Sequence, residues 1–105
     1  MTLEQLSVVL LETGYPTAFQ SFPKKEAPTM PYLIYQAPQA NNFFADGIVF
    51  FSSSRCICFL YTKLRDPAVE ITVETVLNKH QLPWTKDAVY NETEKCFEIT
   101  YEIEV

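Results

Sequence analysis

The last residues of the chain, 95–105, alternate between apolar and polar side chains. The odd positions carry Phe97, Ile99, Tyr101, Ile103 and Val105, and the even positions carry Cys96, Glu98, Thr100, Glu102 and Glu104. Because side chains alternate across a strand, this pattern predicts one long β-strand with an apolar face and an acidic face. Such a strand needs a core for its apolar face and neighbours for its backbone, and the rest of the chain has to supply both.

Length and composition limit the class of protein. At 105 residues the chain has the size of one domain, 1–105, with a modest core. A hydrophobic content of 48% excludes general disorder. With only 2 glycines the chain carries no glycine-rich phosphate loop. A net charge of −5 argues against sequence-specific binding of nucleic acid, which requires clustered Lys and Arg.

The N-terminal apolar run, 1–11, has no basic region before it and no small-residue cleavage site after it, so we expect no signal peptide. We also expect no membrane span, because no apolar stretch reaches the length that a bilayer requires. The 3 cysteines are predicted to be reduced thiols. These features together predict synthesis in a cytoplasm.

The spacing of apolar and capping residues predicts the secondary structure. Two segments have helical spacing: 2–12 and 66–80. Four segments are typical of strands: 32–37, 55–62, 84–90 and 95–105. Residues 13–31 contain four prolines and are predicted to be irregular. The predicted fold is α+β, a mostly antiparallel sheet of four to five strands with two helices packed on one face.

Two of these segments carry further information. Segment 55–62 has apolar side chains on both faces, so it is either a central strand or a strand whose second face another subunit covers. The second helix begins at Asp66–Pro67 and presents an apolar stripe that includes Val73 and Leu77. Its carboxylates Glu70 and Glu74 lie near the positive end of the helix dipole, where negative charge is favoured.

The dipeptide Asp46–Gly47 lies between two apolar runs, 41–45 and 48–51. Asp-Gly in this setting predicts a β-hairpin with a type I′ turn. Phe43 and Phe44 are adjacent, so in a strand they point to opposite faces. Either the other end of the chain covers one side of this strand, or one of the two rings is offered to a partner. Phe43, Phe44, Asp46 and Gly47 are therefore candidate interface residues.

Four residues invite a metal or hydrolytic interpretation: Cys56, Cys58, His80 and Cys96. Cys56 and Cys58 share a strand face, but most zinc sites pair cysteines as CxxC and supply a second pair, which is missing here. A Cys–His hydrolase needs an exposed thiolate beside a base, whereas His80 is predicted at the surface end of a helix. Buried core thiols are the ordinary explanation, and we predict no catalytic, cofactor-binding or metal-binding residue.

Glu98, Glu102 and Glu104 share one face of the last predicted strand. Paired carboxylates can bind Mg²⁺ or Ca²⁺ or act in acid–base catalysis. On an exposed strand they more often form a solvated face or protect an edge against pairing. A third interpretation is that these carboxylates belong to a subunit interface or line a channel.

Four runs occur in a fixed order: MPYLIY at 30–35, NNFFADGIVF at 41–50, LYTKLRDPAVE at 60–70 and LPWTKDAVYNETEKCFEITYEIEV at 82–105. In their order and residue sequence they resemble small proteins from the head–tail region of tailed bacteriophages and prophages of Gram-positive bacteria. The proteins that they resemble are of the tail terminator or tail-to-head joining type. The resemblance covers about residues 30–105, and no catalytic signature is part of it.

The resemblance implies a non-enzymatic virion assembly protein with a small α/β or α+β fold. Tail terminators form a ring, usually a hexamer, that caps the tail tube and presents a surface to the head connector. The implied partners are copies of the chain itself, the tail tube protein and the connector, with no sequence-specific nucleic acid and no membrane.

In such a ring, Glu98, Glu102 or Glu104 would face the DNA-conducting lumen. A neck or head-completion protein is the alternative within this class. A metal-binding or hydrolytic domain built on Cys56, Cys58, His80 and Cys96 is the alternative from another class.

Overall fold

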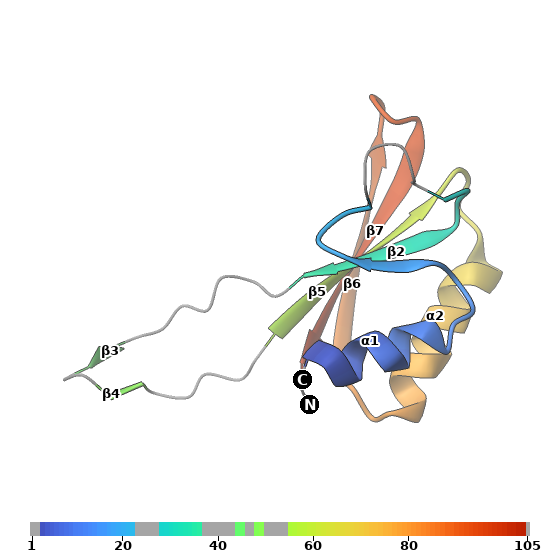
Figure 1. Ribbon diagram of the computed structural model, residues 1–105. Coiled ribbons are helices and arrows are strands. Elements are labelled where there is room, and N and C mark those ends of the chain that lie inside the picture. The colour runs from blue at the N-terminus through green and yellow to red at the C-terminus, as the bar shows by residue number, and fades with distance from the viewer. Residues whose placement is uncertain (1–2, 23–27, 37–43, 46–47, 50–54, 105) are drawn as a thin grey trace.

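The chain forms an α+β fold, in which two helices accompany a mixed, mostly antiparallel five-stranded sheet of order β1-β2-β5-β7-β6 (Figure 1). The computed structural model describes residues 3–22, 28–36, 44–45, 48–49 and 55–104. The elements are α1 Leu3–Leu11, β1 Thr17–Phe19, β2 Tyr32–Gln36, β3 Phe44–Ala45, β4 Ile48–Val49, β5 Arg55–Thr62, α2 Pro67–Lys79, β6 Trp84–Asn91 and β7 Cys96–Glu104. The predicted fold class is confirmed.

Strand β5 lies at the centre of the sheet, as its two apolar faces predicted. It pairs antiparallel with β7 over its whole length, from Arg55 opposite Glu104 to Thr62 opposite Phe97. Strand β2 flanks β5 on the other side and is also antiparallel to it. The centre of the sheet is therefore built from the segments with the clearest strand patterns.

Strand β7 confirms the alternation of the C-terminal segment. Ile99, Tyr101 and Ile103 are fully buried, whereas Glu102 between them is exposed. Cys96 is also buried although it belongs to the opposite, even-numbered set. The even-numbered face of β7 is thus buried at Cys96, where the strand begins, and exposed at Glu104, where it ends.

The prediction that residues 13–31 are irregular is wrong over Thr17–Phe19. These residues form β1, which pairs in parallel with β2, Thr17 lying opposite Leu33. The Leu33 N–H donates to the Pro16 carbonyl at 2.8 Å, so the prolines lie beside this pairing without preventing it. A three-residue strand is too short to show an alternation, which is why the sequence pattern did not reveal it.

Both helices pack on the same face of the sheet (Figure 1). They and the sheet contribute to one buried cluster, whose members include Leu6, Val9, Leu10, Leu33, Leu60, Val73, Leu77, Ile99, Tyr101 and Ile103. Burying one large aliphatic side chain contributes about 1.5–3 kcal/mol, so this cluster is the main source of stability. No helix within the described residues is long and apolar enough to cross a membrane.

The helix ends follow their capping residues. Asp66 is the N-cap of α2, and its carboxylate accepts a hydrogen bond from the Ala68 N–H at 3.1 Å. Pro67 occupies the first helical position, where its missing N–H costs nothing. After α1, Gly14 has a φ of 84°, which glycine adopts without strain. The start of α2 at Asp66–Pro67 was predicted from the sequence.

Strands β3 and β4 form a separate antiparallel pair, with Phe44 opposite Val49 and Ala45 opposite Ile48. This register leaves two residues between the strands and confirms the predicted hairpin. The type of turn at Asp46–Gly47, the position of Phe43 and the side chain of Phe44 lie outside the described residues. Figure 1 shows β3 and β4 away from the five-stranded sheet.

Candidate functional site

The two faces of β5 have different surroundings. Its even-numbered residues, from Cys56 to Thr62, are buried beneath the helices. Ile57, Phe59 and Tyr61 point to the other face and are half-buried. Within the described residues, no helix lies on this second face, which we call the helix-free face. Large apolar side chains therefore occupy a surface that no helix covers in the part of the chain that the structure describes.

Aromatic rings form a continuous row on the helix-free face, which we call the aromatic ladder: Phe22, Tyr32, Tyr61 and Phe59. Phe22 meets Tyr32 edge to face at a centroid distance of 5.2 Å. Tyr32 stacks on Tyr61 at 5.1 Å, and Tyr61 lies 6.3 Å from Phe59. Because the rings partly cover one another, they support one another and form a largely apolar row on this face.

A carboxylate borders the aromatic ladder. Glu98 of β7 lies directly opposite Tyr61 of β5 and is half-buried. Burial, followed by the charge of Glu98, raises the pKa of Tyr61 to about 12. The Tyr61 hydroxyl therefore stays neutral at physiological pH, and the ladder carries no phenolate charge.

The two other predicted acidic residues extend this border. Glu102 and Glu104 are exposed on the helix-free face, and Glu104 lies opposite Arg55. A hollow of about 290 Å³ opens beside them and is lined by Arg55, Pro83, Trp84, Thr85, Glu102 and Glu104. The structure thus brings the three predicted carboxylates to one face, beside an apolar centre. Apolar centres with polar rims are typical of protein–protein interfaces.

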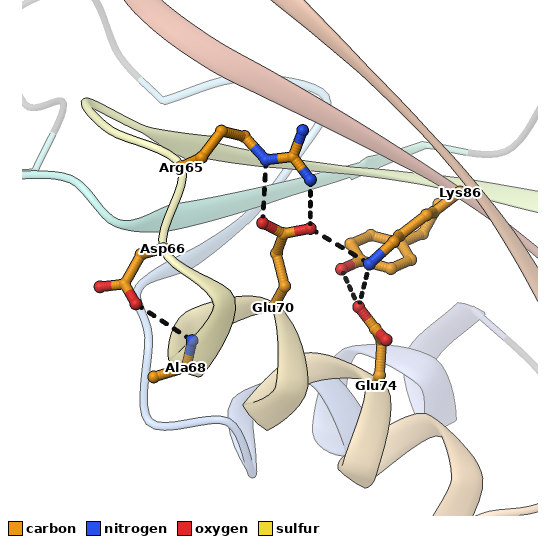
Figure 2. Close-up of polar contacts among 7 residues, drawn as sticks. Arg65, Asp66, Ala68, Glu70, Glu74 and Lys86 are labelled. Carbon is orange, nitrogen blue, oxygen red and sulfur yellow. Dashed lines mark hydrogen bonds and ion pairs between the residues drawn. The ribbon is translucent and has the colours of Figure 1, made fainter.

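A network of ion pairs lies at the junction of α2 with β6 and β7 (Figure 2). Arg65 donates two hydrogen bonds to Glu70, at 3.0 and 3.1 Å. The Lys86 ammonium contacts Glu70 at 3.1 Å and Glu74 at 2.8 Å. The Tyr101 hydroxyl donates to Glu74 at 2.9 Å. The network joins α2 to two strands through side chains that are far apart in the sequence.

The charges of this network compensate one another. Burial alone would raise the pKa of Glu70, but hydrogen bonds from Arg65 and Lys86 outweigh it and hold the pKa below its ordinary value. The hydrogen bond to Glu74 is the main reason that the pKa of Lys86 is raised. Each ionised group faces an opposite charge, so the network holds α2 against the sheet. We call this network the clamp; its residues are Arg65, Glu70, Glu74, Lys86 and Tyr101.

This clamp was not predicted from the sequence. Glu70 and Glu74 were expected near the positive end of the helix dipole, whereas Glu70 is 3% exposed and bound by two cations. The available signal was the four-residue spacing of the two carboxylates, which puts them on one helix face. Their partner Lys86 belongs to a strand whose position only the tertiary fold reveals.

The structure does not bring the four metal-candidate residues together. Cys56 and Cys58 lie beneath the helices, Cys96 lies on the opposite face of the sheet, and His80 caps the C-terminus of α2. The His80 ring instead contacts the Glu12 carboxylate at 3.0 Å. Among the described residues, no group of three or more His, Cys, Asp and Glu side chains has the arrangement of a metal site.

The thiols are buried, as predicted. Burial raises the pKa of Cys58 to about 12 and also raises the pKa of Cys56 and of Cys96. A buried thiol with a raised pKa is a poor nucleophile, because the thiolate is the reactive form.

We therefore expect none of the three thiols to react quickly with dithionitrobenzoate at pH 8 in the folded protein, and all three to react after denaturation. The absorbance of the released chromophore measures both. Rapid reaction of one thiol in the folded state would contradict this expectation and favour the hydrolytic alternative.

No protein-family model matches the chain, and no curated protein matches it in sequence. Two observations remain as guides to function: the composition of the helix-free face and the order of the sequence runs described above.

Proposed function

We propose that the chain is a structural protein of a phage particle, a tail terminator whose copies form a ring, most simply a hexamer. The ring caps the finished tail tube and joins it to the head connector. The observation that carries the proposal is the apolar helix-free face, on which Ile57, Phe59 and Tyr61 of the central strand lie without a covering helix.

The shape of this face favours a protein partner. Ligand sites are usually concave and enclose most of a small molecule. The aromatic ladder is instead a row of rings lying along a sheet, and the hollow of about 290 Å³ lies beside the acidic residues Glu102 and Glu104. An apolar surface with a charged rim suits another folded domain.

Copies of the same chain are the simplest partner for the helix-free face. A small domain has little interior in which to hide apolar surface, so such surface is often satisfied by association. If this face contacts a different surface of the next copy, the contact is heterologous and closes into a ring at a suitable rotation. A ring also supplies the two ends that a tube and a connector require.

The acidic residues have a place in such a ring. Glu98, Glu102 and Glu104 share the helix-free face with the ladder, and the whole chain carries a net charge of −5. Carboxylates along the lumen would repel DNA phosphates at short range, since the Debye length is about 8 Å at physiological salt. Passing DNA would then slide without sticking.

We predict that replacing Glu98, Glu102 and Glu104 together with lysine slows or stops the ejection of DNA, because cations in the lumen would hold the phosphates. Fluorescence of a dye that binds released DNA measures ejection from purified particles. The matched control replaces Glu4, Glu92 and Glu94 with lysine, because these are exposed carboxylates outside the strands. Equal ejection from the two triple variants would contradict the lumen assignment.

Electron microscopy of particles assembled without this protein tests the proposed function. We expect free heads beside tails of uncontrolled length, because nothing then stops growth of the tube. Tails of correct length that fail to join heads would overturn termination and indicate a neck protein instead. Normal, infectious particles would contradict both roles.

A further inference from the structure

Strand β6 is an open edge of the sheet. It is eight residues long and mostly exposed, and its only strand partner among the described residues is β7. The Glu104 N–H donates to the Pro83 carbonyl, which fixes the alternation of hydrogen-bonded pairs between β6 and β7. By this alternation, four residues direct their N–H and C=O groups away from the sheet: Trp84, Lys86, Ala88 and Tyr90.

Several devices that proteins use to block an open edge are missing from β6. Pro83 precedes the strand, and no proline interrupts it. The only lysine of the strand, Lys86, directs its ammonium back to Glu70 and Glu74 and so does not guard the edge. Val89 and Tyr90 are 56% and 48% exposed. A long, regular edge with exposed apolar side chains is a template for another strand.

We infer that two copies of this chain pair edge to edge through β6, antiparallel, about a two-fold axis at Ala88. The occupant of the edge is a second copy, because in one register the strand pairs with itself along nearly its whole length without opposing like charges. In that register Ala88 lies opposite Ala88 of the second copy, Lys86 lies opposite Tyr90, and Asp87 lies opposite Val89.

The other antiparallel registers that join the outward-facing groups are worse. Shifting the strands by one step places the two Asp87 carboxylates opposite each other, and like charges directly opposite each other are destabilising. A further step leaves Val89 and Tyr90 beyond the end of the facing strand. A shift in the other direction opposes the two Val89 side chains and leaves Lys86 beyond the end of the facing strand. The register centred on Ala88 pairs nearly the whole strand without a charge conflict.

Pairing in this register has two consequences. It satisfies the outward backbone groups of β6, and it joins the two sheets so that their helix-free faces lie side by side. The edge contact uses a different surface from the aromatic ladder. A two-fold pair makes both ends equivalent, so this pair is a contact of the free subunit and not one between neighbours in a ring with two different ends. Its test therefore does not depend on the proposed ring. Failure of one leaves the other standing.

Engineered cysteines test the register directly. Asp87 and Val89 are both exposed, and in the inferred register they form a non-hydrogen-bonded pair with Cα atoms about 4.5 Å apart, within reach of a disulfide. We expect an equal mixture of Asp87→Cys and Val89→Cys proteins to form a disulfide-linked heterodimer under mild oxidation. We expect neither variant alone to cross-link with itself. Non-reducing gel electrophoresis and mass spectrometry read the products.

The controls use the same strand. The wild-type protein should give no cross-link, because its own thiols are buried. Ala88→Pro removes an N–H that points outward and replaces a small side chain that packs against the buried cluster, so circular dichroism must first show that the subunit keeps its fold; pairing should then be lost. Sedimentation velocity should then show dimers for the wild type and not for Ala88→Pro. Absence of the heterodimer, or equal self-linking of Asp87→Cys or Val89→Cys, would overturn the inference.

Discussion

Replacing Leu60 with alanine should lower the free energy of unfolding of the isolated subunit by about 3–4 kcal/mol. Leu60 is fully buried on the helix-covered face of β5, where the truncation leaves a cavity. Replacing its neighbour Phe59 with alanine should cost the subunit only about 1–2 kcal/mol, because that ring is half-buried on the helix-free face. Denaturant titration measures both values.

The two variants should have the opposite order of effect on assembly. Phe59→Ala removes a ring of the aromatic ladder, so it should prevent incorporation into particles at temperatures where the subunit is folded. Leu60→Ala should still be incorporated when the temperature is low enough for folding. Leu64→Ala is the control, since Leu64 is 76% exposed and its truncation should change stability by less than about 0.5 kcal/mol. Normal incorporation of Phe59→Ala would contradict the assigned role of the ladder.

Replacing Glu70 with glutamine should lower the free energy of unfolding by about 2 kcal/mol at pH 7. The change keeps the shape of the side chain but removes the charge that Arg65 and Lys86 both contact. This loss of stability is smaller than the loss on breaking a fully buried ion pair, because Arg65 and Lys86 are partly exposed and water solvates their charges in the variant. Thermal or denaturant unfolding at several pH values measures it.

The pH dependence of this variant follows from the pKa of Glu70, which is lower in the folded protein than the ordinary value of 4.5. A carboxylate with a depressed pKa stabilises the folded state above the unfolded pKa, and the contribution is lost as pH falls through the folded pKa. The difference between the wild type and Glu70→Gln should therefore be constant near pH 7 and shrink below about pH 4.5. Glu92→Gln, in an exposed turn, should show no such difference. A difference independent of pH would contradict the clamp.

The elements that the sequence predicted are those with a long local pattern. The alternation in β7 spans nine residues, β5 is an eight-residue strand with apolar side chains on both faces, and an Asp–Pro pair marks the start of α2. Such patterns record which side of an element meets the core. They also placed Glu98, Glu102 and Glu104 on one face before any contact was known.

The features that the sequence did not predict depend on long-range contacts. Strand β1 exists because β2 offers it an edge, and three residues carry no period of their own. The partner of Glu70 on β6, Lys86, lies sixteen residues away in sequence, so no helical spacing reveals it.

The central claim is that other copies of the chain cover the helix-free face. Its most direct test is hydroxyl-radical labelling of side chains in the free subunit and in assembled particles, read by mass spectrometry. Copies packed against the ladder should sharply reduce labelling of Phe59, Tyr61 and Tyr32 in the particle, while Leu64 and Ile71, exposed outside the sheet, stay labelled as in the free subunit. Equal labelling of the three rings in both states, or purified particles that do not contain the chain, would contradict the central claim.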